Sequence, residues 1–292
     1  MEQYVGQLEK VLARSVRKAS KAQKSATGSV AISQSSTYYA GSVASDTHLL
    51  DIPSEQLALT SASHNNDFKI EGVLTLSEES APVVSPIVLK IIADHATRIG
   101  RPIGYCLLNE EREVVFQTED VNSVLPFYAS PLAPLTVIND RRLSPSPVPF
   151  KGSDELFLLK RHTLEGIKRN FPTSDSASGY GAAVLTEGGM VYFGGQYSSP
   201  DKRLGVHAEM GVISRALMEE GARIKAIGVA SSKYEEEPCQ MCGCCRQFLS
   251  EVCERYSIDP TIFCFAASTD AVAIYKIKDL LPNRWTSKKW QP

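Results

Sequence analysis

One histidine and a run of cysteines in the second half of the chain have the spacing of metal ligands. His207 precedes Glu209 by two positions, and the run Cys239–Cys245 contains pairs of cysteines three positions apart. One histidine and two thiolates give Zn²⁺ three protein ligands and leave a fourth position open for water, as in catalytic zinc sites. Zinc lowers the pKa of such a water towards about 7. Glu209 is placed to accept its proton and return it to a leaving group, so these residues predict a hydrolytic zinc site.

The same residues resemble a known enzyme family. His-x-Glu with Pro-Cys-x-x-Cys is the pattern of zinc deaminases, and the stretches 206–216, 242–248 and 275–282 are similar to cytidine deaminases that act on free nucleosides. The resemblance covers most of residues 155–285. It implies one Zn²⁺ per chain, bound in the second half, and hydrolytic deamination of cytidine, deoxycytidine or a related pyrimidine nucleoside, as in pyrimidine salvage. It also implies that Glu209 accepts a proton from the water and delivers protons to ring N3 and to the departing ammonia.

The cysteine run offers two overlapping ligand pairs. Cys239 and Cys242 follow a proline, whereas Cys242 and Cys245 precede Arg246-Gln247. In the family that this chain resembles, the second cysteine ligand directly precedes Arg-Gln at the start of a helix, where the helix dipole and free N–H groups stabilise a thiolate. We therefore expect His207, Cys242 and Cys245 to bind the metal. Cys239 in place of Cys245 is the alternative.

The resemblance also assigns substrate contacts, and here the sequence departs from the family. Gln196 and Ser198 stand where cytidine deaminases hold the ribose with Asn and Glu, and the backbone N–H of Ala208 would help to hold the base. Glutamine keeps a donor and an acceptor, but serine lacks the carboxylate. An aromatic residue that stacks on the base could be Tyr180 or Phe171. The substrate is therefore cytidine itself or a modified nucleoside, a nucleotide or a nucleoside antibiotic.

Composition and charge bear on partners and location. The chain has 31 Lys and Arg against 33 Asp and Glu, a net charge of −2, so the electrostatic argument for a polynucleotide substrate is missing. The pair Lys202-Arg203 could still contact a phosphate. No run of about 18 apolar residues occurs, and the N-terminus lacks an apolar signal core. We expect a cytoplasmic protein without a membrane partner. A zinc-stabilised binding module without catalysis is the alternative of a different class.

The elements that position these residues occur twice. Each half is expected to begin with an amphipathic helix, at 3–22 and at 154–170, followed by a pair of strands, a helix, a strand and another helix. Equivalent features are separated by 153 residues (Gly28 to Gly181), 154 (Glu55 to Glu209) and 156 (Pro126 to Pro282). Near-constant offsets indicate a duplication. Alternating strands and helices predict an α/β fold, with tandem cytidine-deaminase-like α/β/α layers, each a mixed central sheet flanked by helices.

Only the second copy keeps its ligands. Pro53-Ser-Glu55 stands where the second half has His207-Ala-Glu209, and residues 83–90 contain neither cysteine nor histidine. Proline cannot bind zinc, so we expect Glu55 to be structural. We divide the chain into a degenerate domain at 1–143, a Pro-rich linker at 144–153 and a catalytic domain at 154–292. Two-domain relatives form homodimers, which implies a homodimer here as well.

Overall fold

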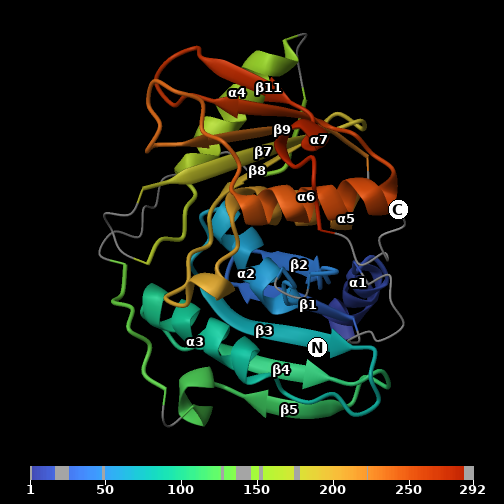
Figure 1. Ribbon diagram of the computed structural model, residues 1–292. Coiled ribbons are helices and arrows are strands. Elements are labelled where there is room, and N and C mark those ends of the chain that lie inside the picture. Colours follow the sequence, from blue (N-terminus) through green and yellow to red (C-terminus); the bar gives the residue numbers. More distant parts are fainter. Residues whose placement is uncertain are drawn as a thin grey trace.

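A computed structural model describes residues 2–16, 26–47, 50–125, 128–135, 146–150, 154–173, 178–221 and 223–285. Two β-sheets lie towards opposite ends of the molecule, with helices between them (Figure 1). The elements of the first half are α1 (Glu2–Ala13), β1 (Thr27–Ser33), β2 (Thr37–Gly41), α2 (Ser54–His64), β3 (Ile70–Ser77), α3 (Pro86–Ile99), β4 (Gly104–Leu108), β5 (Val114–Thr118) and the 3₁₀ turn η1 (Val121–Val124).

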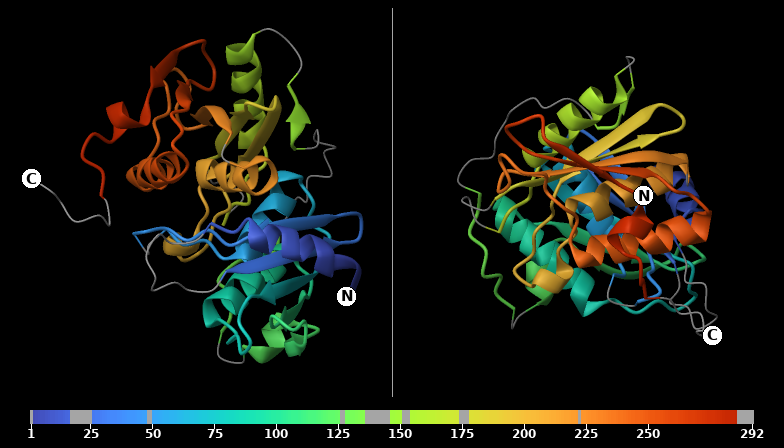
Figure 2. Two further views of the ribbon diagram at one scale, coloured as in Figure 1. Left: turned by 90° about the vertical axis from the view of Figure 1, so that its right-hand side faces the viewer. Right: turned by 45° about the horizontal axis from the view of Figure 1, so that its top comes forward.

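The second half repeats this series. It consists of β6 (Val148–Pro149), α4 (Glu155–Ile167), β7 (Tyr180–Thr186), β8 (Met190–Gly195), the 3₁₀ turn η2 (Lys202–Leu204), α5 (Ala208–Glu220), β9 (Ile224–Ser231), α6 (Gly243–Tyr256), β10 (Thr261–Phe265), β11 (Val272–Tyr275) and α7 (Ile277–Leu280). In Figure 2 the first half, coloured blue to green, and the second half, yellow to red, stack one on the other.

The two sheets have the same strand order. It is β2-β1-β3-β4-β5 in the first and β8-β7-β9-β10-β11 in the second, where β6 adds an edge strand beside β8. In each sheet the third and fourth strands of this order are parallel and the other pairs are antiparallel. The pairing slips between Ile32 and Ser33, and again between Leu185 and Thr186, 153 residues later. The predicted tandem of layered α/β units is confirmed.

Local sequence signals explain where the helices and turns lie. Proline at the first position of α3, Pro86, has the fixed φ that a helix start requires, and Gly100 ends this helix in the left-handed conformation, at φ 71°. The turn between β7 and β8 likewise uses Gly189, at φ 77°. Local chemistry therefore accounts for both ends of α3 and for the turn between β7 and β8.

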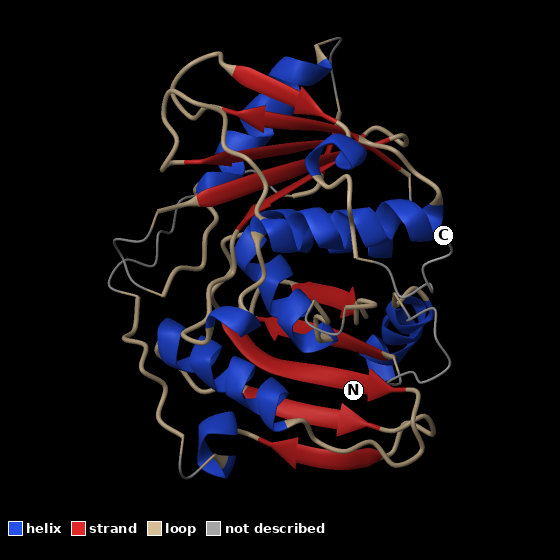
Figure 3. Ribbon diagram, in the orientation of Figure 1, coloured by secondary structure: helices blue, strands red, loops and turns tan. Residues whose placement is uncertain are grey.

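Helices cover both faces of the sheets, and α5 and α6 lie between the two sheets (Figure 3). Leu8 of α1 packs on the outer face of the first sheet, and Leu159 of α4 packs on the outer face of the second. Helices α2, α3, α5 and α6 share one hydrophobic cluster that joins the halves, with members such as Leu57, Ile92, Ile213 and Leu249. The largest cluster is therefore common to both copies, and each copy also has a smaller cluster of its own on the outer face of its sheet.

Contacts across this core come in equivalent pairs. Arg14 Nη1 donates to the carbonyl of Met218 near the end of α5, 2.7 Å away, and Arg169 Nη1 donates to the carbonyl of His64 at the end of α2. The offset is 155 residues for the arginines and 154 for their acceptors. The two halves therefore contact each other as the subunits of a two-fold symmetric dimer do, each through the same surface.

Two expectations about segments differ from the structure. The first helix ends at Ala13 rather than at residue 22, and residues 17–22 of the expected helix lie outside the described residues. Within the expected linker, 144–145 and 151–153 are also outside them, but Val148–Pro149 pairs with β8. Ser146 Oγ donates to the carbonyl of Phe193 and accepts from its N–H. This part of the linker belongs to the second sheet because those bonds extend its edge. Among the described residues, no helix is long and apolar enough to cross a membrane.

Candidate metal centre and active site

His207, Cys242 and Cys245 converge where two helices begin. The His207 Nδ1 atom lies 3.3 Å from Cys242 Sγ and 3.4 Å from Cys245 Sγ, and the ligand atoms of the three residues lie within 4.8 Å of one another. Tetrahedral zinc with ordinary bond lengths would separate a nitrogen and a sulfur ligand by roughly 3.5 Å. The donor set and its spacing therefore fit one Zn²⁺.

The helices themselves favour thiolates at this place. His207 is the N-cap of α5 and Cys242 is the N-cap of α6, both with extended backbone. The free N–H groups and positive dipole end of each helix therefore lie beside the ligands. The pKa of Cys242 is lowered to about 3, chiefly by a hydrogen bond from Cys245 and then by one from His207. This arrangement can hold an anionic sulfur at neutral pH.

Cys239 lies outside this group. Its side chain is fully buried, its N–H donates to the carbonyl of Phe265, and burial raises the pKa of its thiol to about 12. Cys264 is also buried, whereas Cys244 is exposed. The geometry therefore brings Cys245, and not Cys239, to His207 and Cys242.

Glu209 is buried immediately behind the ligands. It is the second residue of α5, its side chain is only 5% exposed, and burial raises the pKa of its carboxyl group. A carboxylate with a raised pKa is a stronger proton acceptor than an ordinary one. Ala208, the first residue of α5, has an N–H that the helix cannot pair internally. Ala208 and Glu209 thus follow His207 directly at the start of α5.

The segment with Gln196 and Ser198 runs beside the residue that precedes His207. Tyr197 and Val206 pair through both backbone hydrogen bonds, of 2.9 and 2.8 Å. Tyr197 is buried, whereas Gln196 and Ser198 are partly exposed, as expected because side chains alternate along an extended segment. The two residues therefore face away from the core on the chain that leads to His207.

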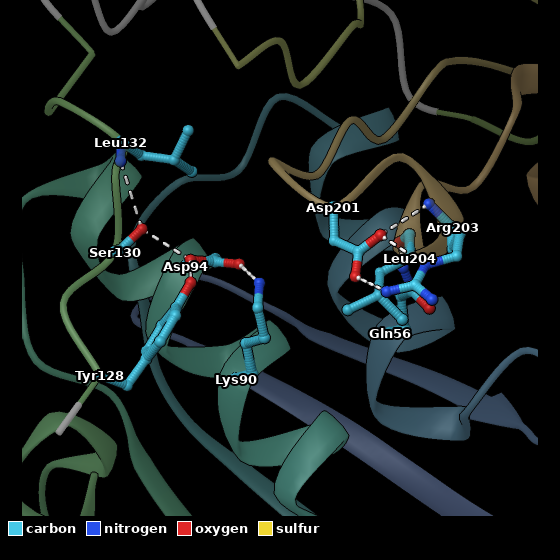
Figure 4. A network of polar contacts seen from close by, with 9 residues as sticks. All are labelled: Gln56, Lys90, Asp94, Tyr128, Ser130, Leu132, Asp201, Arg203 and Leu204. Carbon is cyan, nitrogen blue, oxygen red and sulfur yellow. Dashed lines mark hydrogen bonds and ion pairs between the residues drawn. The ribbon is translucent and has the colours of Figure 1, made fainter. Parts of the chain in front are cut away.

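Two residues considered for substrate contacts have other partners in the structure. Phe171 is 1% exposed and stacks on His95 and Tyr197, so its ring is not open to a nucleobase. Arg203 binds both carboxylate oxygens of Asp201 (Figure 4). This pairing lowers the pKa of Asp201 to about 2 and offsets the charge of Arg203. Arg203 thus has a local ion-pair partner, and this pairing weakens the prediction that it contacts a phosphate group of the substrate.

Residues of the first half also contact this segment, and local sequence patterns do not reveal them. Gln56 Nε2 donates to the carbonyl of Leu204 (Figure 4). His64 Nε2 lies 2.8 Å from the carbonyl of Gly195, which can only accept, so the nitrogen donates. These contacts join residues more than a hundred positions apart, and hydrophobic periodicity predicts faces of elements but not their partners.

The equivalent place in the first half has a different chemistry. Pro53 is the N-cap of α2, as His207 is of α5, and Ser85 is the N-cap of α3, as Cys242 is of α6. Buried there, Glu55 Oε1 accepts hydrogen bonds from Thr75 Oγ1 at 2.9 Å and from Tyr105 Oη at 3.0 Å. Hydroxyl donors thus surround Glu55, and none of these neighbours is a soft metal ligand.

Comparisons with known proteins give matches among solved structures only. No family model matches the sequence, and no curated protein matches it. Three similar solved structures are cytidine deaminases. That of Burkholderia pseudomallei is 23% identical, with a TM-score of 0.40, over 45% of this chain and all of the other. That of Mycobacterium leprae is 18% identical, with a TM-score of 0.36, over 45% of this chain and all of the other. That of Mycobacterium tuberculosis is 20% identical, with a TM-score of 0.37, over 46% of this chain and 99% of the other.

Proposed function

We propose that this chain is a zinc-dependent hydrolase that deaminates cytidine, deoxycytidine or a related pyrimidine nucleoside to the uridine product and ammonia. The observation that carries the proposal is the convergence of His207, Cys242 and Cys245 with buried Glu209 at the start of α5. Three soft or borderline ligands leave one zinc position open, which is the arrangement of a catalytic rather than a structural site.

Each residue then has a stated task. His207, Cys242 and Cys245 would hold the metal, and Zn²⁺ when bound would supply a water molecule acidified towards neutral pH. Glu209 would accept one proton from the water that attacks C4 and deliver it to ring N3. It would then accept the second proton from the hydroxyl group formed on C4 and deliver it to the amino group, which leaves as ammonia. Burial of Glu209 supports this exchange because its raised pKa brings the acid and base forms closer in free energy. The Ala208 N–H helps to hold the base.

The experiment compares two glutamates that occupy equivalent positions. Zinc content and ammonia release are measured for the wild type, Glu209→Gln and Glu55→Gln, with cytidine and deoxycytidine followed by loss of absorbance at the cytosine band. We expect Glu209→Gln to keep its zinc and to lose about 10²–10⁴-fold in kcat, and Glu55→Gln to retain kcat. Near-normal ammonia release by Glu209→Gln would refute the mechanism.

The substrate is the open part of the proposal. Gln196 and Ser198 replace the ribose-binding residues of the family that the sequence resembles, so a panel should include modified nucleosides, nucleotides and a single-stranded oligonucleotide. Salt-dependent binding of the oligonucleotide would favour a polynucleotide substrate. A zinc-loaded protein that acts on no pyrimidine compound would favour the second candidate, a zinc-stabilised binding module, which the changed positions motivate.

The organisation of the chain completes the proposal. We assign catalysis to residues 154–292 and a metal-free supporting role to residues 1–143, because Pro53 and Ser85 occupy the N-cap positions of the ligands in the first half. A homodimer in the cytoplasm is our expectation for the assembled enzyme. Sedimentation of the purified full chain would distinguish a dimer from a monomer.

A further inference from the structure

A histidine of the first half is buried against the candidate site of the second. His95, on α3, is fully buried, and its Nδ1 atom lies 2.9 Å from Tyr197 Oη. The planes of the two rings are parallel within 5°. Phe171 stacks on both rings, with centroid distances of 4.6 Å to His95 and 4.8 Å to Tyr197. The contact therefore combines a buried hydrogen bond with an aromatic cluster.

Tyr197 connects His95 to the candidate site. It lies between Gln196 and Ser198, and its backbone pairs with Val206, the residue before His207. The N–H of Ser198 also donates to the carbonyl of Phe171, 2.8 Å away. Fixing the Tyr197 ring thus fixes the backbone of the proposed ribose-binding residues and of the first metal ligand.

Packing alone does not account for a histidine at position 95. Its Nε2 atom is buried without a hydrogen-bond partner among the described residues, which costs about 1–3 kcal/mol. A phenylalanine would stack on Phe171 without this cost. Histidine supplies what phenylalanine cannot, a ring nitrogen for the hydroxyl of Tyr197, and buried polar groups left unsatisfied are frequently a sign of function.

We propose that His95 is a positioning residue for the metal and nucleoside site of the second half, and that it acts through its hydrogen bond to Tyr197. The first half then contributes to the reaction without touching the reacting atoms. The expected effect on nucleoside binding rests on the proposed function. The expected effect on metal binding does not, because Tyr197 pairs with the residue before His207 whether or not the protein acts on a nucleoside.

The test uses the full-length chain and four variants. His95→Phe keeps the stacked ring and removes the nitrogen, Tyr197→Phe removes the hydroxyl, and the double variant removes both. Tyr105→Phe is the matched control because it removes a buried hydroxyl whose hydrogen bond, to Glu55, lies within the first half. Zinc affinity is measured by competition with a chelator, KM and kcat are measured with cytidine, and stability is measured by urea unfolding.

We expect each single variant to raise the zinc Kd about 10-fold, the lower end of the effect of outer-shell partners. KM should rise several-fold and kcat should change less than KM. The double variant should be no worse than the poorer single variant, because both remove the same hydrogen bond. Tyr105→Phe should lower stability while zinc Kd and KM stay at the wild-type values.

Two results would overturn the inference. One is a wild-type zinc Kd and KM in His95→Phe and Tyr197→Phe with only a loss of stability like that of Tyr105→Phe. The other is additive effects in the double variant, which would mean that the two side chains act independently. A zinc-loaded wild type that turns over no nucleoside would instead refute the proposed function, and the zinc measurements would still decide the role of His95.

Discussion

Two histidines at the junction of the halves should make the fold sensitive to mild acid. Burial is the first cause that lowers the pKa of both His64 and His95, each to about 3. For His64, the nearby charges of Arg215 and Arg169 lower it further, whereas the bond to Gly195 raises it. The unfolded chain binds these protons near pH 6.5, so protonation favours unfolding.

The sign and size follow from these values. A base with a folded-state pKa below its unfolded value contributes stability that is full above about pH 6.5 and is lost as pH falls towards 3. The loss is about 1.4 kcal/mol per pH unit for each histidine. Between pH 7.5 and 5.0, His64 alone should therefore cost about 2 kcal/mol, and the two histidines together about 4 kcal/mol.

The decisive comparison is between the wild type and His64→Gln. The glutamine amide can still donate to the carbonyl of Gly195, but it does not titrate. Urea unfolding at pH 7.5, 6.5, 5.5 and 5.0 should show a shallower loss in the variant, smaller by about 2 kcal/mol at pH 5.0. Loss of zinc from His207 in acid affects both proteins and cancels in the difference. Parallel curves for the two proteins would refute the assignment of a neutral, buried His64.

Two further predictions concern the metal and its counterpart in the first half. Cys245→Ser should lose stoichiometric zinc and Cys239→Ser should keep it, as measured by metal analysis of the purified proteins; the opposite pattern would mean that Cys239 is the ligand. Glu55→Gln should lower the free energy of unfolding by about 1–3 kcal/mol, because the amide keeps one acceptor oxygen where the carboxyl group has two and buries an N–H₂ group among hydroxyl donors. The exposed control Glu71→Gln should change it by less than about 0.5 kcal/mol, and equal effects in urea unfolding would contradict a structural role for Glu55.

Local chemistry in the sequence predicts the elements and the ligand cluster well. His207 and Cys242 are found because short spacings and helix starts are encoded within a few residues, and the repeat is found because its offset is nearly constant. Phe171 illustrates the limit. An aromatic residue near the expected pocket could stack on a base, but only the tertiary structure shows that His95 and Tyr197 already cover its ring.

The strand in the expected linker illustrates a second limit. Alternating prolines predict an extended chain, and an extended chain is also what a sheet edge accepts. Pairing of Val148–Pro149 with β8 depends on where Met190 and Val191 lie in space, which no local pattern encodes. The same holds for His64, since a histidine at the end of a helix gives no indication of a partner at Gly195.

The shared core explains why a copy without ligands would keep its fold. Pro53 and Ser85, at the N-caps of α2 and α3, offer no soft metal ligand, but the first half supplies about half of the buried residues in the cluster that also buries α5 and α6. A Cβ atom at Gly194 of the second sheet would lie 2.3 Å from the His64 ring, so the packing between the halves tolerates little change. Packing against the second half therefore constrains the first half whether or not it has metal ligands of its own.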